Sequence, residues 1–152
     1  MSYILMAVAD TEYTPAANGP AGLVQVVMNT QVPGKIRRWA VFADAISVTA
    51  QPIIIDLVRQ ANAGAGATAV TPQVITPAGS SAAGSASVRP TTLPVPIGLA
   101  LDSAEFHPQS GYDYTFPMGQ EPDVDGGKRA GIQMSTPNTV NVRAKIWWSE
   151  RG

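Results

Sequence analysis

The sequence predicts an all-β fold, a single antiparallel β-sandwich of jelly-roll-like kind over residues 1–152, with long loops rich in Gly, Ala, Ser and Pro. Apolar and polar residues alternate along Val140–Trp148, and this period of two places successive side chains on opposite faces of a strand. Turn residues recur about every 8 to 15 residues, a spacing typical of sandwich strands. The chain contains no Cys, so packing and assembly must hold the core.

The N-terminal third predicts strands separated by Pro- and Gly-containing turns. Tyr3–Ala9 is apolar, but no Lys or Arg precedes it, so a strand is favoured over a signal peptide. A loop is expected up to Gly22, which makes residues 1–22 a candidate N-terminal arm. Strands are expected at Leu23–Met28 and, as one bent strand or two short ones, at Arg37–Val48.

Ile53–Gln60 follows a proline and begins with three isoleucines. Its spacing also allows a helix, but β-branched residues after a proline favour a strand. The composition then shifts to Ala, Gly, Ser and Thr over Ala61–Ser87. A flexible linker is one interpretation. The β-prone residues within the segment favour an extended excursion over the surface, one that could lie flat on a neighbouring subunit.

Three further strands are expected in the C-terminal half. Ile97–Leu101 alternates large and small residues, as strands in a tight sandwich do. The next two each place three apolar or aromatic residues on one face, Tyr112, Tyr114 and Phe116 in one, and Ala130, Ile132 and Met134 in the other. Each of these patterns has the period of a half-buried strand.

Charged residues make up 14% of the chain and the formal net charge is -1. Soluble domains have about 25% charged residues, so part of this surface must be covered by small polar residues or by partners. A nearly neutral chain lacks the basic face that captures nucleic acid or anionic membranes. We therefore expect neither nucleic acid nor a membrane as a partner.

The acidic run from Glu121 through Asp123 and Asp125 to Gly126 resembles the start of a calcium loop, in which oxygen ligands alternate before a glycine. It departs from that pattern because Ile132 stands where the loop requires its bidentate Glu. The alternative is an acidic β-hairpin turn. No cofactor is expected.

Aromatic and basic residues suggest where partners bind. Arg37, Arg38 and Trp39 stand together, and Trp147 lies on the polar face of the last predicted strand. Aromatic residues and Arg are enriched at protein interfaces. We therefore predict interface residues at these four positions and at Tyr3, with a solvated strand start or a sheet edge as the alternatives.

No catalytic constellation is visible in the sequence. His107 is the only histidine, and a zinc site or a catalytic imidazole needs partners that are absent. Asp102 and Glu105 are expected to be surface charges at the end of a strand rather than the paired carboxylates of a glycosidase. The expectation is a protein that is not an enzyme.

Residues 53–150 resemble the small all-β head decoration, or cement, proteins of tailed bacteriophages. The similarity lies in Ile55–Gln60, in Ala69–Pro72, in the run from Phe106 to Tyr114, in Gly126–Gly131 and in Val140–Glu150. It implies a virion structural protein made in the host cytoplasm and placed on the capsid surface. It further implies a homotrimer that binds the major capsid protein and bridges capsomers to stabilise the head.

The alternative is a tail- or fibre-associated module that recognises host glycans. Tyr112, Tyr114 and His107 would then form its aromatic platform.

Overall fold

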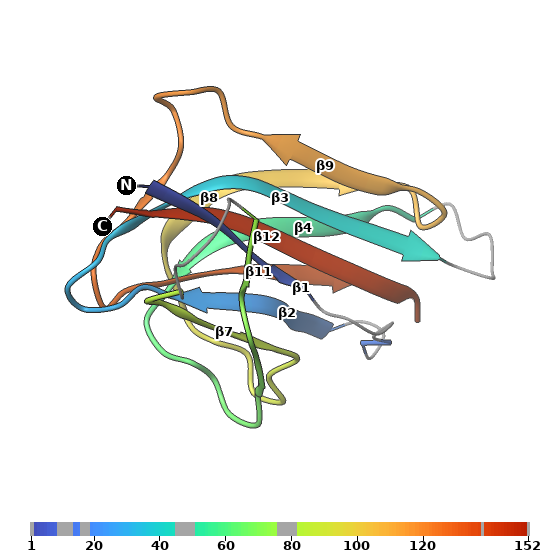
Figure 1. Ribbon diagram of the computed structural model, residues 1–152. Helices are drawn as coiled ribbons and strands as arrows, with labels where there is room; N and C mark the ends of the chain where they lie inside the picture. Colours follow the sequence, from blue (N-terminus) through green and yellow to red (C-terminus); the bar gives the residue numbers. More distant parts are fainter. Residues whose placement is uncertain are drawn as a thin grey trace.

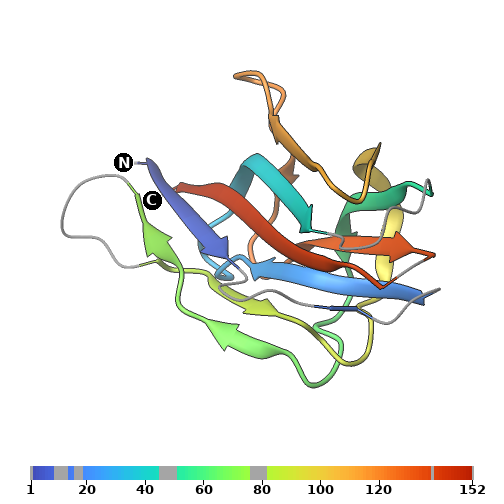
Figure 2. The same cartoon turned by 90° about the vertical axis from the view of Figure 1, so that its right-hand side faces the viewer.

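The computed structural model describes residues 2–8, 14–15, 19–44, 51–75, 82–137 and 139–151, and for residues 2–8 and 151 it describes only the backbone. This part of the chain consists of strands and loops. They form two antiparallel β-sheets that pack face to face (Figures 1 and 2). The predicted β-sandwich is confirmed.

The first sheet is built around β3 and β12, which pair along most of their length. On its far side β12 pairs with β1, and β1 with β6, whereas the opposite edge of β3 carries both β9 and β10. The six strands are β1 (Ser2–Val8), β3 (Gly34–Asp44), β6 (Gln73–Val74), β9 (Gly111–Thr115), β10 (Asp123–Val124) and β12 (Asn141–Arg151).

The second sheet has the order β5-β7-β2-β11-β4-β8, so β5 and β8 form its edges. Its six strands are β2 (Gly19–Val27), β4 (Ile53–Gln60), β5 (Thr68–Val70), β7 (Ser85–Val88), β8 (Pro96–Phe106) and β11 (Arg129–Thr136). Both chain ends lie at the same end of the sandwich, because Ser2 pairs with Arg151 (Figure 1).

The core lies between the sheets and follows the predicted alternation. In β12 the alternate residues Val142, Ala144, Ile146 and Trp148 are buried. Buried apolar residues of β4 and β11, such as Ile55, form the opposite layer of the core. Each fully buried aliphatic or aromatic side chain contributes about 1.5–3 kcal/mol relative to exposure, so this shared interior holds a chain without disulfides together.

Several strand boundaries differ from the prediction. The bounds of β4 match, and the helical alternative for Ile53–Gln60 is wrong. β2 begins at Gly19, so the loop predicted up to Gly22 is too long. Residues 2–8 are not a free arm, because β1 is inserted between β12 and β6. β3 is one strand that ends at Asp44, and residues 45–50 of the predicted strand lie outside the described residues.

The described part of the 61–87 segment is folded onto the sandwich rather than extended as a linker. It supplies β5 and β7 to the second sheet and β6 to the first. The turns around it cover the outer face of the second sheet, where Gln25 Nε2 donates to Gln60 Oε1 and to Asn62 O at 2.6 and 3.0 Å. On the same face Gln133 Nε2 donates to Pro94 O at 2.8 Å. The covering turns thus supply hydrogen-bond acceptors to the amides of Gln25 and Gln133, as buried polar groups require.

Candidate interaction surface

A β-bulge in β3 places two arginines on the outer face of the first sheet. The register of β3 against β12 shifts by one residue at Arg37. Ile36 and Trp39, which lie on either side of the two arginines, are both fully buried. Strict alternation would turn one of them outward, and the extra residue of a bulge removes that conflict. Arg37 and Arg38 therefore both reach partners on the outer face.

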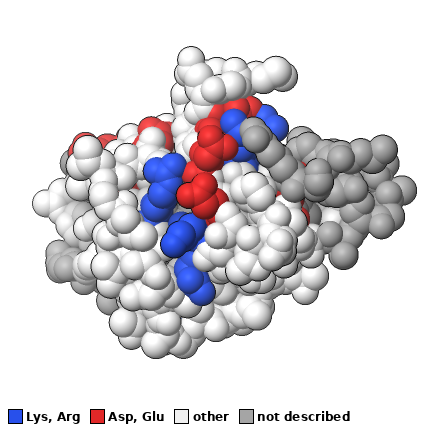
Figure 3. All heavy atoms as spheres, turned by 90° about the vertical axis from the view of Figure 1, so that its left-hand side faces the viewer, with Lys and Arg blue, Asp and Glu red and all other residues white. Residues whose placement is uncertain are grey.

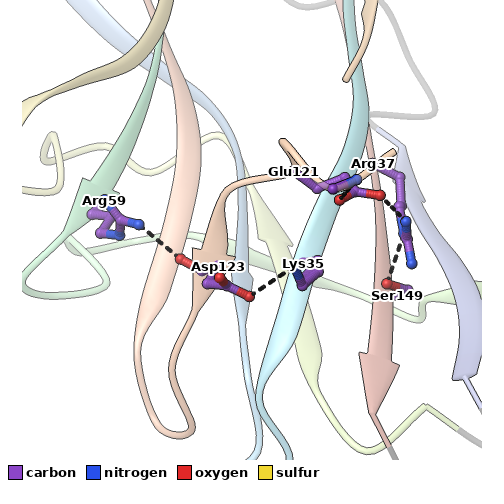
Figure 4. A network of polar contacts seen from close by, with 7 residues as sticks. Lys35, Arg37, Arg59, Glu121, Asp123 and Ser149 are labelled. Carbon is purple, nitrogen blue, oxygen red and sulfur yellow. Dashed lines mark hydrogen bonds and ion pairs between the residues drawn. The ribbon is translucent and has the colours of Figure 1, made fainter. Parts of the chain in front are cut away.

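Arg37 fastens the segment that follows β9. Its Nε donates to Ser149 Oγ on β12 at 2.9 Å, and its guanidinium forms an ion pair with Glu121 (Figure 4). The backbone carbonyl of Arg37 accepts a bond from Phe116 N at 3.0 Å. One residue of β3 thus holds the segment at its beginning, through Phe116, and at its end, through Glu121.

The segment held in this way, residues 117–120, projects from the sandwich between β9 and β10 (Figure 1), and we call it the finger. Its own turn is closed by Gln120 N, which donates to Pro117 O at 2.9 Å. Gly119 takes a φ of +88°, a conformation that favours glycine. Met118 forms the tip and is 94% exposed. The finger is therefore a short, fastened projection with an apolar tip.

The Glu121 side chain is only 3% exposed and is surrounded by donors. Its carboxylate accepts a bond from Gly119 N at 2.7 Å. Its own backbone N–H is the largest cause of a pKa below the usual range, and burial opposes that effect. The Gly119 N–H and the charges of Arg37 and Lys35 lower the pKa further. Glu121 is therefore ionised when it fastens the finger.

Beside the finger lies a second feature, formed by Arg38, Asp113 and Trp147, which we call the tryptophan patch. Arg38 Nε donates to Asp113 Oδ1 at 2.7 Å, and a second bond makes the ion pair bidentate. The guanidinium carbon lies 4.5 Å from the centroid of the Trp147 ring. The hydrogen bonds from Arg38 hold the pKa of Asp113 below its usual range, with a smaller effect from Lys145. The ion pair with Asp113 holds the Arg38 guanidinium over the Trp147 ring.

The charges of this end of the molecule form a band (Figure 3). Lys35 Nζ lies 3.4 Å from Asp123 Oδ1, and Arg59 Nη2 donates to Asp123 O at 2.9 Å (Figure 4). An uncharged projection stands above the band in Figure 3, where the finger lies. The hydrogen bonds and ion pairs of these charged residues connect β3, β4, β10 and β12 around the base of the finger.

The calcium interpretation is corrected by these contacts. The carboxylates of Glu121 and Asp123 face cationic side chains and do not converge on a common point. In the described part of the chain no three His, Cys, Asp or Glu side chains are grouped to hold a metal ion. Asp125 begins a turn, in which Lys128 N donates to its carbonyl at 3.0 Å. The turn is not a hairpin, because β10 and β11 belong to different sheets.

The predicted interface residues have separate roles. Trp39 is fully buried, so its assignment to an interface is wrong: the bulge turns it into the core. Arg37 is occupied at the base of the finger. Arg38 and Trp147 are brought together in the tryptophan patch. The side chain of Tyr3 lies outside the described residues. The finger was missed, since an exposed Met between Pro and Gly gives no periodic signal.

An aromatic row follows the inner side of β9 at the open edge of the sandwich. The ring centroids of Trp39 and Tyr112 are 5.0 Å apart, those of Tyr112 and Tyr114 are 6.3 Å apart, and those of Tyr114 and Phe116 are 5.0 Å apart. Asp102 on β8 crosses to this row from the second sheet. Its Oδ2 accepts from Trp39 Nε1 at 3.0 Å and from Tyr112 OH at 3.2 Å. Asp102 therefore connects the two sheets and is not a solvated surface charge.

Burial raises the pKa of Tyr112 to about 12, with the nearby charge of Asp102 and its hydrogen bond adding to the effect. His107 sits in the turn before β9, where its Nδ1 accepts from Gln109 N at 3.2 Å. Tyr114, by contrast, is 38% exposed. Of the predicted glycan platform, Tyr112 is therefore committed to the fold, whereas Tyr114 and His107 are exposed.

No protein-family model, curated protein or solved structure matches this chain. Over the residues that the structure describes, no helix has the length and apolar character needed to cross a membrane.

Proposed function

We propose that this protein is a non-enzymatic virion structural protein that binds the outer surface of a tailed-phage capsid, where it bridges neighbouring capsomers and stabilises the head. The proposal starts from the resemblance of sequence motifs in residues 53–150 to phage decoration proteins, and the β-sandwich is the fold that this resemblance implies. The observation that carries it is a fastened finger with an apolar tip, Met118, beside a partly exposed Arg38–Trp147 pair.

This surface has the composition of a protein contact. Trp and Arg dominate the binding energy of many interfaces, and burial of an apolar side chain such as Met118 contributes about 1.5–3 kcal/mol. Arg37 and Glu121 fix the finger before binding, which lowers the entropy lost on association. A homotrimer would present three such surfaces to adjacent capsid subunits, so modest contacts would add through effective concentration.

The test is the occupancy of purified expanded capsids by the wild-type chain and by variants. Met118→Asp and Trp147→Ala should each lower the apparent affinity at least about tenfold, since about 1.4 kcal/mol corresponds to one decade. Ile54→Asp is the matched control, because Ile54 is 42% exposed on β4 of the other sheet. Equal binding by all four proteins would refute the assignment of this surface, and no binding by wild type would refute the capsid proposal.

A second variant separates contact from positioning. Glu121→Gln removes the charge that fastens the finger and leaves Met118 in place. It should weaken capsid binding less than Met118→Asp does, and it should increase hydrogen exchange at Gly119, whose N–H it binds. Weaker binding without faster exchange at Gly119 would show that Glu121 contacts the capsid itself.

The alternative function, recognition of host glycans by a tail or fibre module, is favoured by one observation: Tyr114 is exposed and its neighbour Phe116 meets it edge to face. Such a pair could stack on a sugar ring. A glycan array supports this alternative if it gives hits that are lost in Tyr114→Ala. An array without hits would remove it.

A further inference from the structure

The strand β9 forms an edge of the first sheet, and its pairing shows which of its backbone groups face outward. In the described part of the chain, β9 pairs with β3 alone. Just before β9, Ser110 O accepts from Ala43 N at 2.9 Å. Just after it, Phe116 N donates to Arg37 O at 3.0 Å. Bonds to the same neighbour recur at every second residue of an antiparallel strand, so the even-numbered residues of β9 bond to β3.

The odd-numbered residues of β9, which are Gly111, Asp113 and Thr115, therefore direct their backbone N–H and C=O groups away from β3. All three residues are exposed, and β9 is the uppermost strand in Figures 1 and 2, with no other strand beyond it. The register of β9 against β3 runs without a bulge. The outer edge is thus a regular row of donors and acceptors on which another strand can pair.

The other long edge of the sandwich is protected against such pairing. β8 begins with Pro96, and its residues 98–101 bulge out of the pairing with β4. Further along β8, Ser103 N donates to Asp102 Oδ1 at 3.0 Å. The edge strands β5 and β6 have only three and two residues. Proline, bulges and short strands are the means by which proteins block edge pairing, and over the described residues β9 has none of them.

The side chains of β9 define the segment that fits beside it. Tyr114 lies on the inner side, in the aromatic row, and is 38% exposed. Side chains of neighbouring strands lie beside each other on each face of a sheet, so an added strand would cover Tyr114 with its own inward side chains. On the outer face it would meet Asp113, which is bound by Arg38. An extended segment with apolar residues at every second position and polar residues between them satisfies both faces.

A second copy of this chain fits the edge less well than a different protein does. If two copies of β9 paired antiparallel through all their outward residues, Asp113 of one copy would stand opposite Asp113 of the other. Like charges directly opposite each other destabilise a pair of strands. β9 also runs directly into the finger, and Asp113 belongs to the tryptophan patch. The edge is therefore continuous with the surface that we assign to the capsid.

We propose that β9 accepts an extended segment of the partner protein as an additional strand of the first sheet. The backbone of the segment bonds to Gly111, Asp113 and Thr115, its apolar side chains pack beside Tyr114, and its polar side chains lie on the outer face. In the proposed function this segment belongs to the major capsid protein, and to that extent the inference rests on the proposed function.

The first test needs no capsid and measures hydrogen exchange of the purified full chain, residue by residue. The amides of Gly111, Asp113 and Thr115 should have protection factors at least about tenfold lower than those of Tyr112 and Tyr114, which bond to β3. Equal protection of all five amides would show that the edge is already occupied, by another part of the chain or by a second copy, and would overturn the proposal.

The second test compares two variants of one residue in the occupancy of purified expanded capsids. Thr115→Pro removes an outward N–H and no bond to β3, and proline is tolerated on an edge strand where the N–H faces solvent. Thr115→Ala is the matched control, because it loses the side chain and keeps the N–H. The proline variant should bind about tenfold more weakly than the alanine variant, since it lacks a donor and its ring meets the added strand.

Hydrogen exchange of the capsid-bound wild type provides a measurement that does not depend on the folding of a proline variant. The amides of Gly111, Asp113 and Thr115 should become protected on binding. Wild type that binds capsids without this protection, or equal binding by Thr115→Pro and Thr115→Ala, would overturn the inference and leave the proposed function standing. Failure of the wild type to bind capsids would refute the proposed function and, with it, the capsid protein as the source of the segment.

Discussion

Removal of the Asp102 carboxylate should loosen the open edge of the sandwich. In Asp102→Ala, Trp39 Nε1 loses the acceptor that lies 3.0 Å away, and Trp39 itself is fully buried. An unsatisfied buried donor costs about 1–3 kcal/mol. Tyr112 OH also loses its partner, but this side chain is partly exposed and can turn to water, so its loss adds less than about 1 kcal/mol.

The expected total is a free energy of unfolding lower by about 1–4 kcal/mol, out of the roughly 5–15 kcal/mol that a domain has. At about 2–4 °C per kcal/mol for a chain of this size, Tm should fall by about 2–16 °C. Urea unfolding followed by tryptophan fluorescence measures the change directly. The midpoint should shift while the slope against urea stays constant, because the same surface is exposed on unfolding.

Two variants make this measurement specific. Asp102→Asn keeps an acceptor oxygen and should recover part of the loss. Glu105→Ala removes an exposed carboxylate from the same strand and should change stability by less than about 0.5 kcal/mol. If Asp102→Ala is no less stable than Glu105→Ala, Asp102 does not connect the sheets and our account of this edge is wrong.

Other predictions concern pH and packing. Glu121 has a lowered pKa in the folded chain, so its stabilising effect is present above its unfolded pKa and is lost as the pH falls through the folded value; Glu121→Gln should flatten the acid side of a Tm–pH profile. The pKa of Tyr112 is raised to about 12, so this side chain stabilises the folded chain below its unfolded pKa of about 10, and the effect is lost as the pH rises to about 12. Tyr112→Phe should abolish this loss of stability at high pH. Gly34→Ala brings a Cβ to 2.5 Å from Met28 Sδ and should cost about 1–3 kcal/mol in urea unfolding, whereas Gly19→Ala meets nothing within 4 Å and should cost less.

Strands could be predicted correctly from the sequence where the local alternation of apolar and polar residues decides the structure. Ile53–Gln60 and Val140–Trp148 form the predicted strands, because β-branched residues or strict alternation leave few other ways to bury their apolar faces. The segment from Ala61 onward was harder. Its small residues do not reveal that β5 and β7 extend one sheet while β6 joins the other.

The candidate site depends on long-range register, which periodicity does not contain. Trp39 was assigned outward beside two arginines, but the bulge at Arg37 reverses the alternation, and the bulge exists only against β12, more than a hundred residues later. Arg37 and Glu121 are 84 residues apart in sequence, so nothing local marks them as partners. The alternation correctly gave Trp147 an outward position, although its pairing with Arg38 emerged only from the fold.

The most direct test of the central proposal is a cryo-electron microscopy map of expanded tailed-phage capsids saturated with the chain. Our account predicts ordered density for the sandwich on the outer capsid surface, with the finger and Trp147 turned toward the major capsid protein and Met118 in contact with it. Capsids that carry no added density, or chains bound with the finger pointing into solvent, would contradict it.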